Sequence, residues 1–278
     1  MILDARPLVD AKVLEIKKIT DNMVRKPKLV IIRVGEDKAS EKYVTNKVKL
    51  CHRAGIESEL LHLPESVDME EVKFHIRRYN QDYNISGILL QLPLPAHLNE
   101  KELTECIYPR KDVDGFTTAN LGKLVVGESA PRACTPSGIM ELLNYYGVEV
   151  EGKDVLIINR SNIVGKPLAL MMLEKNATVT IAHSRTRNLK DKVKQADIVV
   201  TAIGKPNFFR AEDFKKDAVV VDVSINVDEN NKLCGDVCKA DYDKINMITP
   251  VPFGVGQTTV MSLIEQTLWM HIRELSSR

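Results

Sequence analysis

Tyr43 and Lys47 lie four residues apart in the segment Ser40-Glu-Lys-Tyr-Val-Thr-Asn-Lys47. On a helix this spacing puts both side chains on one face. A lysine beside a tyrosine can position an aromatic substrate and handle a proton. Farther along the chain, the loop 159–167 reads Asn-Arg-Ser-Asn-Ile-Val-Gly-Lys-Pro, and a dinucleotide-phosphate site there would supply a hydride acceptor. Together the two motifs predict an enzyme with two chemistries in one cleft.

Gln91 and Asp114 are further candidates beside Lys47. Gln91 stands in an apolar strand end, Leu-Leu-Gln-Leu-Pro, where a buried amide needs a partner such as an amine or a substrate carbonyl. Asp114 precedes Gly115 and is either a turn residue or a carboxylate that accepts N–H groups from a heterocycle. Lys47 could also be an ordinary solvated lysine on a surface helix. The presence of Gln91 favours a catalytic role for Lys47 instead.

The loop 159–167 stands where a Rossmann fold binds pyrophosphate. Of the fingerprint G-x-G-x-x-G only Gly165 is present, at the position where helix and strand pack closely. Ser161 and the N–H groups at the start of the next helix can hold an anion. The alternative is an ordinary connection between a strand and a helix.

The following strand ends in Ala-His-Ser-Arg-Thr-Arg over residues 182–187. It lacks the carboxylate that an NAD site uses to bind the ribose 2′-hydroxyl. Arg160 and Ser184, with Arg185, can instead bind a 2′-phosphate, so the sequence favours NADP as the cofactor. His183 is interpreted as a structural or rim residue, because a strand end beside a nucleotide needs no acid or base.

Apolar periodicity predicts an α/β fold in two domains. Strands are expected at 29–34, 56–63, 85–91, 155–158, 177–181, 198–202 and 218–223, with helices between them and a last helix from about Thr259 to Glu274. The helix carrying Lys47 should stop near Gly55. This alternation predicts parallel sheets with ligands at the carboxyl ends of their strands.

The domain change is expected near a helix that Thr135 caps, with Pro136 at its first position. No helix or strand is predicted in the glycine-containing stretch before it, 116–133. The predicted domains are 1–137 plus 266–278, an α/β catalytic domain, and 138–265, a Rossmann-like doubly wound domain for the nucleotide.

The composition excludes several classes of protein. Lys and Arg number 39 and Asp and Glu 38, so no global charge favours nucleic acid or an anionic membrane. No apolar run approaches the roughly 20 residues that span a bilayer, and the start lacks a signal-peptide pattern. The 5 scattered cysteines fit reduced thiols in a cytoplasm. Cys234 and Cys238 have no second Cys/His pair at zinc spacing, so no metal is expected.

A set of short segments occurs in one order over nearly the whole chain. They are Tyr43-x-x-x-Lys47, Gly87-Ile-Leu-Leu-Gln91-Leu-Pro-Leu-Pro95, Lys111-Asp-Val-Asp-Gly115, Cys134-Thr-Pro136, Arg160-Ser161-x-x-Val164-Gly165-x-Pro167, His183-Ser184 and Thr249-Pro-Val-Pro252. In this combination the chain resembles the bifunctional methylenetetrahydrofolate dehydrogenase/methenyltetrahydrofolate cyclohydrolase family.

The resemblance implies oxidation of 5,10-methylenetetrahydrofolate with NADP, then hydrolysis of the methenyl cation to 10-formyltetrahydrofolate. Lys47 would handle protons, Gln91 would hold Lys47 and polarise the substrate, and Tyr43 would stack on the folate. Asp114 would accept hydrogen bonds from the pterin, and Pro252 would line the folate side. The family's cofactor positions fall on Asn159, Arg160, Ser161, Ser184 and Ile225. The resemblance also implies a homodimer joined through the nucleotide domains, in one-carbon metabolism and purine biosynthesis.

The chain departs from the family pattern mostly on the nucleotide side. Asn159 replaces a usual Gly, and Asn tolerates a left-handed backbone there. Ser224 also replaces a usual Gly, Ala133 replaces a Pro, Phe253 adds a ring and Gln257 removes a proline. A cyclohydrolase with weak or lost dehydrogenase activity is therefore the alternative within the same fold.

Two other classes of protein share some of these features. Short-chain dehydrogenases share Tyr-x-x-x-Lys, but there the pair follows the nucleotide loop, whereas here it precedes that loop. A non-catalytic nucleotide-binding regulator would tolerate Lys47→Met without any measurable change. The set Tyr43, Lys47, Gln91 and Asp114 disfavours the regulator.

Overall fold

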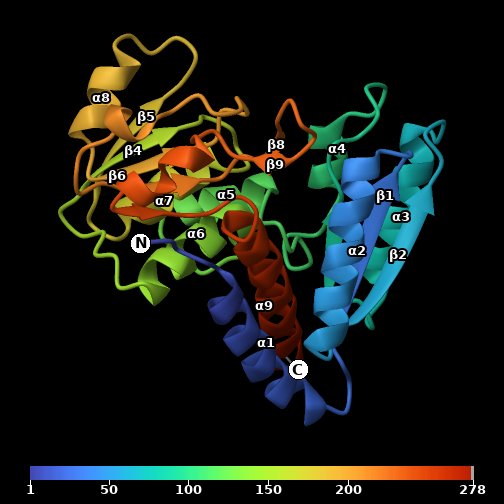
Figure 1. Ribbon diagram of the computed structural model, residues 1–278. Coiled ribbons are helices and arrows are strands. Elements are labelled where there is room, and N and C mark those ends of the chain that lie inside the picture. Colours follow the sequence, from blue (N-terminus) through green and yellow to red (C-terminus); the bar gives the residue numbers. More distant parts are fainter. Residues whose placement is uncertain (277–278) are drawn as a thin grey trace. The chain divides into compact units, whose positions relative to one another are not determined.

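The computed structural model describes residues 1–276, with the backbone alone at positions 38 and 39. It divides into two compact units. The N-terminal unit comprises Ala11–Cys134 and the chain from Val260 onward, and the C-terminal unit comprises Met1–Asp10 and Thr135–Thr259. Each unit is built on a parallel sheet with helices against it, which confirms the predicted α/β class (Figure 1).

The sheet of the N-terminal unit has three parallel strands in the order β2-β1-β3. They are β1 (Lys28–Val34), β2 (Glu57–Leu63) and β3 (Gly87–Leu90). The strand order reverses between β1 and β3, and ligands of such sheets bind at the carboxyl ends beside that reversal. Gln91 stands at this place, one residue past β3, and its N–H donates to the carbonyl of Ile32 at 2.8 Å.

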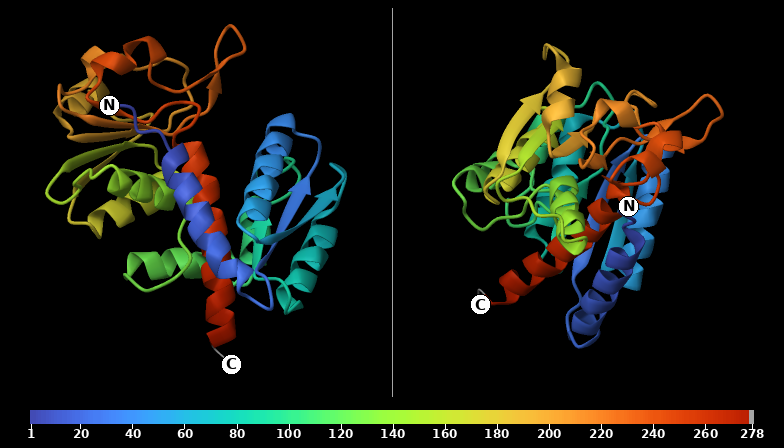
Figure 2. Two further views of the ribbon diagram at one scale, coloured as in Figure 1. Left: turned by 60° about the horizontal axis from the view of Figure 1, so that its bottom comes forward. Right: turned by 60° about the vertical axis from the view of Figure 1, so that its left-hand side comes forward.

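Helices α2 (Lys38–Arg53) and α3 (Met69–Gln81) lie on opposite sides of this sheet (Figures 1 and 2). Side chains alternate along a strand, so Val30 and Ile32 point to one face, where they join a core with Val72 and Ile76 of α3. The Asp37 carboxylate accepts from the N–H of Ser40 at 2.7 Å and caps α2.

The remaining helices with residues in this unit are α1 (Arg6–Asp21), α4 (Glu100–Glu105), α5 (Thr118–Val125) and α9 (Val255–Ser276). Helix α5 lies in the stretch for which the sequence predicted no element. Helix α9 begins four residues before the predicted Thr259. The hydroxyls of Thr258 and Thr259 both donate to the carbonyl of Val255 at 3.0 Å, so these threonines are satisfied inside the first turn.

The C-terminal unit contains a five-stranded parallel sheet in the order β10-β7-β6-β4-β5. The strands are β4 (Asp154–Ile158), β5 (Thr178–Ala182), β6 (Ile198–Thr201), β7 (Val219–Asp222) and β10 (Met247–Ile248). This order is doubly wound, as predicted, with its reversal between β4 and β6. A short hairpin, β8 (Asn226–Val227) and β9 (Leu233–Cys234), follows β7.

Two cores cover the two faces of this sheet. Helices α6 (Cys134–Tyr145) and α7 (Gly165–Leu173) contribute Ile139 and Leu168 to one core. Helix α8 (Leu189–Gln195) contributes Val193 to the other, together with residues beside the 3-10 turns η1 (Ala211–Asp213) and η2 (Lys239–Lys244). The amino-terminal segment also belongs here, since Ile2 bridges to Ile248 in parallel.

The predicted start of α6 is wrong. The helix begins at Cys134, so Thr135 is its second residue and not its cap, and Pro136 is its third. Proline is tolerated there because the first four N–H groups of a helix have no partner within it. The domain change still lies at this helix, between its first two residues, Cys134 and Thr135.

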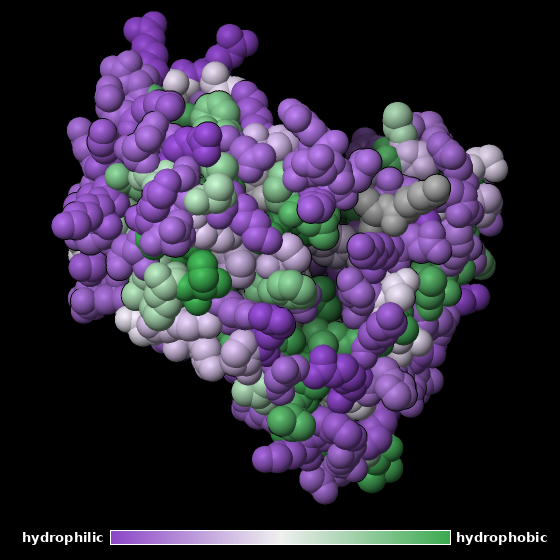
Figure 3. Space-filling model, viewed as in Figure 1, coloured by the Kyte–Doolittle hydropathy of each residue, from purple (hydrophilic) through white to green (hydrophobic). Residues whose placement is uncertain are grey.

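Hydrophilic residues cover most of the face shown in Figure 3. Among residues 1–276, no helix combines the length and the apolar character needed to cross a membrane.

Candidate active site

Lys47 lies on the buried face of α2. Every third or fourth residue of this helix and its C-cap is buried: Ser40, Val44, Lys47, Cys51 and Ala54. Lys47 therefore occupies a position that an amphipathic helix gives to an apolar residue. Its side chain is only 8% exposed.

Gln91 holds the Lys47 ammonium group. Lys47 Nζ donates to Gln91 Oε1 at 2.8 Å, and Gln91 Nε2 donates to the carbonyl of Leu92 at 2.6 Å. The second bond fixes the amide so that its oxygen faces the lysine. The structure thus brings together the two residues that the sequence places 44 positions apart.

The surroundings of Lys47 shift its protonation equilibrium. Burial lowers the pKa of Lys47, although the negative charge of Asp114 opposes the shift. Burial raises the pKa of Asp114 to about 6, and Lys47 opposes that shift in turn. Burial also raises the pKa of Cys51 to about 12, so this neighbour stays a neutral thiol. The site therefore contains an amine that is easier to deprotonate than an ordinary lysine.

Tyr43 lies on the same helix, with its ring centroid 6.0 Å from Lys47 Nζ. Its side chain is half-buried, and burial raises the pKa of its phenol, which therefore stays protonated at neutral pH. A partly open aromatic face beside the amine is suited to stacking on a flat ring.

Two residues that the sequence reasoning missed hold the Asp114 loop. The Asp112 carboxylate accepts from Thr117 N at 2.8 Å and from Asn120 Nδ2 at 2.9 Å. Gln266 of α9 donates through Nε2 to the carbonyl of Val113 at 2.8 Å. Gln266 has no local sequence signal, because its partner Val113 is 153 residues away in the chain.

In the C-terminal unit, Asn159 organises the predicted nucleotide loop. Its Oδ1 accepts from Ser161 N at 2.8 Å and Gly165 N at 3.1 Å, and its Nδ2 donates to Ala202 O at 2.8 Å. The expected left-handed backbone is not found, since Asn159 does not have a positive φ. The side chain instead ties together the loops after β4 and β6, on either side of the reversal in strand order.

The other predicted cofactor residues surround this loop from neighbouring strand ends. Ser184 follows β5 and Ile225 follows β7, and both are exposed, as is Arg160. His183 accepts from Arg185 N through Nδ1 at 3.2 Å, in line with a structural role. Pro252 belongs to the same unit and follows a cis peptide bond with Val251.

Asp236 supports two of these strand ends and was also missed. It is fully buried, and its Oδ2 accepts from the hydroxyls of Thr201 and Ser224 at 2.8 and 2.7 Å. The same oxygen accepts from Ile203 N at 2.9 Å. The serine that replaces the family's usual glycine is thus satisfied by a buried carboxylate.

The loop fits a bound dinucleotide in two respects. A Cβ on Gly165 would lie 2.1 Å from the Asn159 carbonyl oxygen, which is the close approach of helix to strand that such loops require. Within the described part of the chain, no hydrogen bond or ion pair engages the side chains of Arg160 and Ser184. They can therefore bind an anion.

No group of three or more metal-ligating side chains was found in residues 1–276. Cys238 instead accepts from Arg210 Nη1 at 2.9 Å.

Fold and sites define a class: two-domain α/β enzymes that combine a dinucleotide unit with a substrate unit. Family models described as "Tetrahydrofolate dehydrogenase/cyclohydrolase, catalytic domain" and "Tetrahydrofolate dehydrogenase/cyclohydrolase, NAD(P)-binding domain" match residues 3–114 and 133–275. The chain therefore belongs to the tetrahydrofolate dehydrogenase/cyclohydrolase family.

Individual relatives agree over almost the full length. The chain is 51% identical over 253 residues to the bifunctional protein FolD of Streptococcus thermophilus, covering 90% of this chain and 88% of the relative. The FolD crystal structure from Campylobacter jejuni matches with a TM-score of 0.95 and 39% identity, over 98% and 99% of the two chains. The Trypanosoma brucei enzyme, complexed with NADP and an inhibitor, matches with a TM-score of 0.93 and 35% identity, over 99% and 98%.

Proposed function

We propose that this enzyme oxidises 5,10-methylenetetrahydrofolate to the methenyl cation with NADP and then hydrolyses that cation to 10-formyltetrahydrofolate. The observation that carries the proposal is the buried hydrogen bond of 2.8 Å between Lys47 and Gln91. A buried lysine with a lowered pKa, held by an amide, suits proton transfer at a bound cation.

In the hydrolytic step, the oxygen of water forms a bond to the methenyl carbon, and the neutral amine of Lys47 takes the proton that the water loses. The hydroxyl now on this carbon then loses its proton and becomes the formyl carbonyl as the bond between the carbon and N5 breaks, and N5 takes up a proton while the formyl group stays on N10. The net reaction consumes one water and releases one proton. Gln91 keeps the lysine amine aimed at the reacting carbon.

The remaining residues of the folate site bind the substrate and orient it. Tyr43 stacks on the pterin, Asp114 accepts its N–H groups, and Pro252 lines the folate side of the site. Asp114 performs this role as a carboxylate, and it is mostly ionised at neutral pH because its pKa is about 6.

NADP, when bound, supplies the hydride acceptor. Asn159, Arg160, Ser161, Ser184 and Ile225 hold it in this proposal, with Arg160 and Ser184 on the 2′-phosphate. The absence of any carboxylate from residues 182–187 and the NADP complex of the Trypanosoma brucei relative support NADP over NAD.

The proposal extends to assembly and cellular setting. A homodimer through the nucleotide unit is supported by β5, an edge strand whose Ile181 is 39% exposed. A cytoplasmic location is supported by five free cysteines, and the product implies a role in purine biosynthesis. The domain assignment 1–137 plus 266–278 and 138–265 also stays a proposal, with residues 277 and 278 outside the described part of the chain.

A matched pair of variants tests the function. Lys47→Met should abolish the enzyme-catalysed decay of methenyl absorbance, whereas Lys42→Met, an exposed lysine on the same helix, should not change it. NADP reduction is measured on the same preparations. Methenyl decay at the wild-type rate in Lys47→Met contradicts the proposal, and wild-type decay without NADP reduction supports a cyclohydrolase alone.

A further inference from the structure

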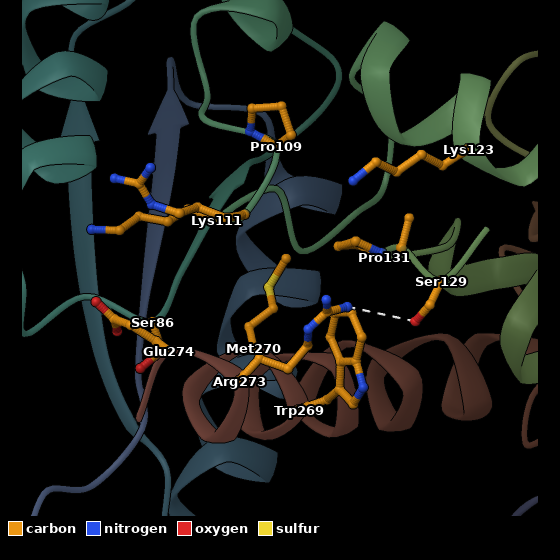
Figure 4. Close-up of a pocket in the computed structure, with 12 residues that line it drawn as sticks. Ser86, Pro109, Lys111, Lys123, Ser129, Pro131, Trp269, Met270, Arg273 and Glu274 are labelled. Carbon is orange, nitrogen blue, oxygen red and sulfur yellow. Dashed lines mark hydrogen bonds between the residues drawn. The ribbon is translucent and has the colours of Figure 1, made fainter. Parts of the chain in front are cut away.

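A cavity lies in the N-terminal unit, with a volume of about 580 Å³. Pro131, Trp269, Met270 and Arg273 line it, together with Ser86 and Lys111 (Figure 4). The volume falls within the range of small-molecule sites, roughly 300 to 1,000 Å³. Its lining combines apolar surface from Trp269 and Met270 of α9 with basic side chains.

The cavity lies at the other end of the sheet from Lys47. Ser86 precedes β3 and Gln91 follows it, and the five residue steps between them span about 16 Å at roughly 3.3 Å per step. The segment 109–114 runs parallel to β3, bridging Ile88 to Asp112, so Pro109 lies at the cavity end and Asp114 at the active-site end. The cavity is therefore not part of the folate site.

The walls are held in place by buried polar contacts. Asn120 of α5 donates to the carbonyl of Pro109 at 2.9 Å and to Asp112 at 2.9 Å, which fixes α5 against this segment. Lys111 is only 4% exposed, and its Nζ donates to the carbonyls of Tyr79 and Asp82. A preformed cavity loses little conformational freedom when a ligand enters.

The charges at the cavity are unbalanced. Its single carboxylate, Glu274, is paired with Arg25 at 3.1 Å, and Lys111 is committed to backbone carbonyls. The other basic side chains of the lining are those of Arg110, Lys123 and Arg273. In the described residues none of these three forms an ion pair. Figure 4 shows Lys123 reaching from α5 toward Pro131. Such a surplus attracts an anion.

The indole of Trp269 gives the cavity an aromatic surface, which favours a ligand that carries a ring as well as an acidic group. The guanidinium of Arg273 lies 4.6 Å from the Trp269 ring centroid, and Arg273 reaches the Ser129 hydroxyl only at 3.5 Å, too far for a strong hydrogen bond (Figure 4). A planar guanidinium over an indole can bind an acidic group while a ring packs on the apolar wall.

We propose that this cavity binds a small organic anion that carries a flat ring, such as an aromatic phosphate or carboxylate. The acidic group binds Lys123, Arg110 and Arg273, and the ring packs against Trp269, Met270 and Pro131.

Trp269 is the only tryptophan of the chain, so its fluorescence reports on the cavity directly. Phenyl phosphate should change this fluorescence in a saturable way. Inorganic phosphate lacks the ring and phenol lacks the acidic group, so both should bind much more weakly. Lys123→Ala and Arg110→Ala should each weaken phenyl phosphate by about tenfold, the effect of losing one charge-assisted contact of about 1.5 kcal/mol.

Lys101→Ala, an exposed lysine of α4 away from the cavity lining, is the control and should bind normally. Lys47→Met should also bind normally, so failure of the proposed folate chemistry is distinguishable from failure of this site. Three results overturn the proposal: no saturable change, an equal response to inorganic phosphate, or wild-type binding by both Lys123→Ala and Arg110→Ala.

Discussion

Replacing Gln91 with Glu places a carboxylate where an amide oxygen now accepts from Lys47 at 2.8 Å. At an effective dielectric constant of about 20, two unit charges at this distance attract by about 6 kcal/mol, which corresponds to about 4 pKa units. The position is only 9% exposed, so burial of the new carboxylate opposes its ionisation and reduces the effect. We expect the pKa of Lys47 to rise by about 2 units.

The consequence is a loss of neutral amine. At neutral pH the fraction of uncharged Lys47 should fall about a hundredfold, and the rate of methenyl hydrolysis should fall with it. Because the lysine still titrates, activity should recover as the pH is raised. Gln91→Met removes the acceptor without adding charge, so it should lower the rate without moving the profile toward alkaline pH.

The assay follows methenyl absorbance across a pH series, with the uncatalysed decay subtracted at each pH. A Gln91→Glu enzyme with the wild-type rate and profile would refute the assignment of Lys47 as the group that takes up the proton. An alkaline shift of the same size in Gln91→Met would refute the electrostatic explanation, since that variant adds no charge.

Three further predictions concern other parts of the molecule. Gly165→Ala puts a Cβ at 2.1 Å from the Asn159 carbonyl oxygen, so NADP affinity, measured by titration, should fall by at least tenfold, or about 1.4 kcal/mol, while methenyl hydrolysis persists; unchanged NADP binding would contradict the loop assignment. The pKa of Asp114 is raised to about 6, so the carboxylate is protonated as the pH falls through that value, and the KM for folate should rise there. Asp114→Asn should show a KM independent of pH in this window. If the KM of this variant still rises at acidic pH, the titrating group is not Asp114. Phe253 has a φ of +81°, which strains a bulky residue by about 1–2 kcal/mol, partly offset by the Arg6 guanidinium 4.6 Å from its ring. Phe253→Gly should therefore raise the midpoint of thermal unfolding, and a lower midpoint would show that the ring contact outweighs the strain.

Local patterns predicted much of the fold. The strands around Val30 and Ile157 lie where apolar runs placed them, because a strand buried on both faces needs continuous hydrophobic residues. The pairing of Lys47 with Gln91 could also be anticipated, since a lysine and a glutamine at buried positions each require a partner. The start of α6 could not be predicted exactly, because a proline such as Pro136 is tolerated both as the first and as the third residue of a helix.

Other features depend on contacts between distant residues. Asn159 looked like a replacement for the conformational freedom of glycine, but its side chain bonds to Ala202, 43 residues away. Gln266 and Asp236 support the two sites from elements with no motif of their own. Helix α5 was missed because Gly122 and the flanking glycines weaken its helical pattern, although Thr117 caps it.

The most direct test of the central claim is the pKa of Lys47 itself, measured by NMR titration of the enzyme with isotope-labelled lysine side chains and assigned by comparison with Lys47→Met. The structure predicts a value below the ordinary lysine pKa of about 10.4, because the amine is buried and its main partner is an uncharged amide. A value at or above 10.4 would show that Lys47 stays fully charged at neutral pH, and the proposed proton transfer would then be wrong.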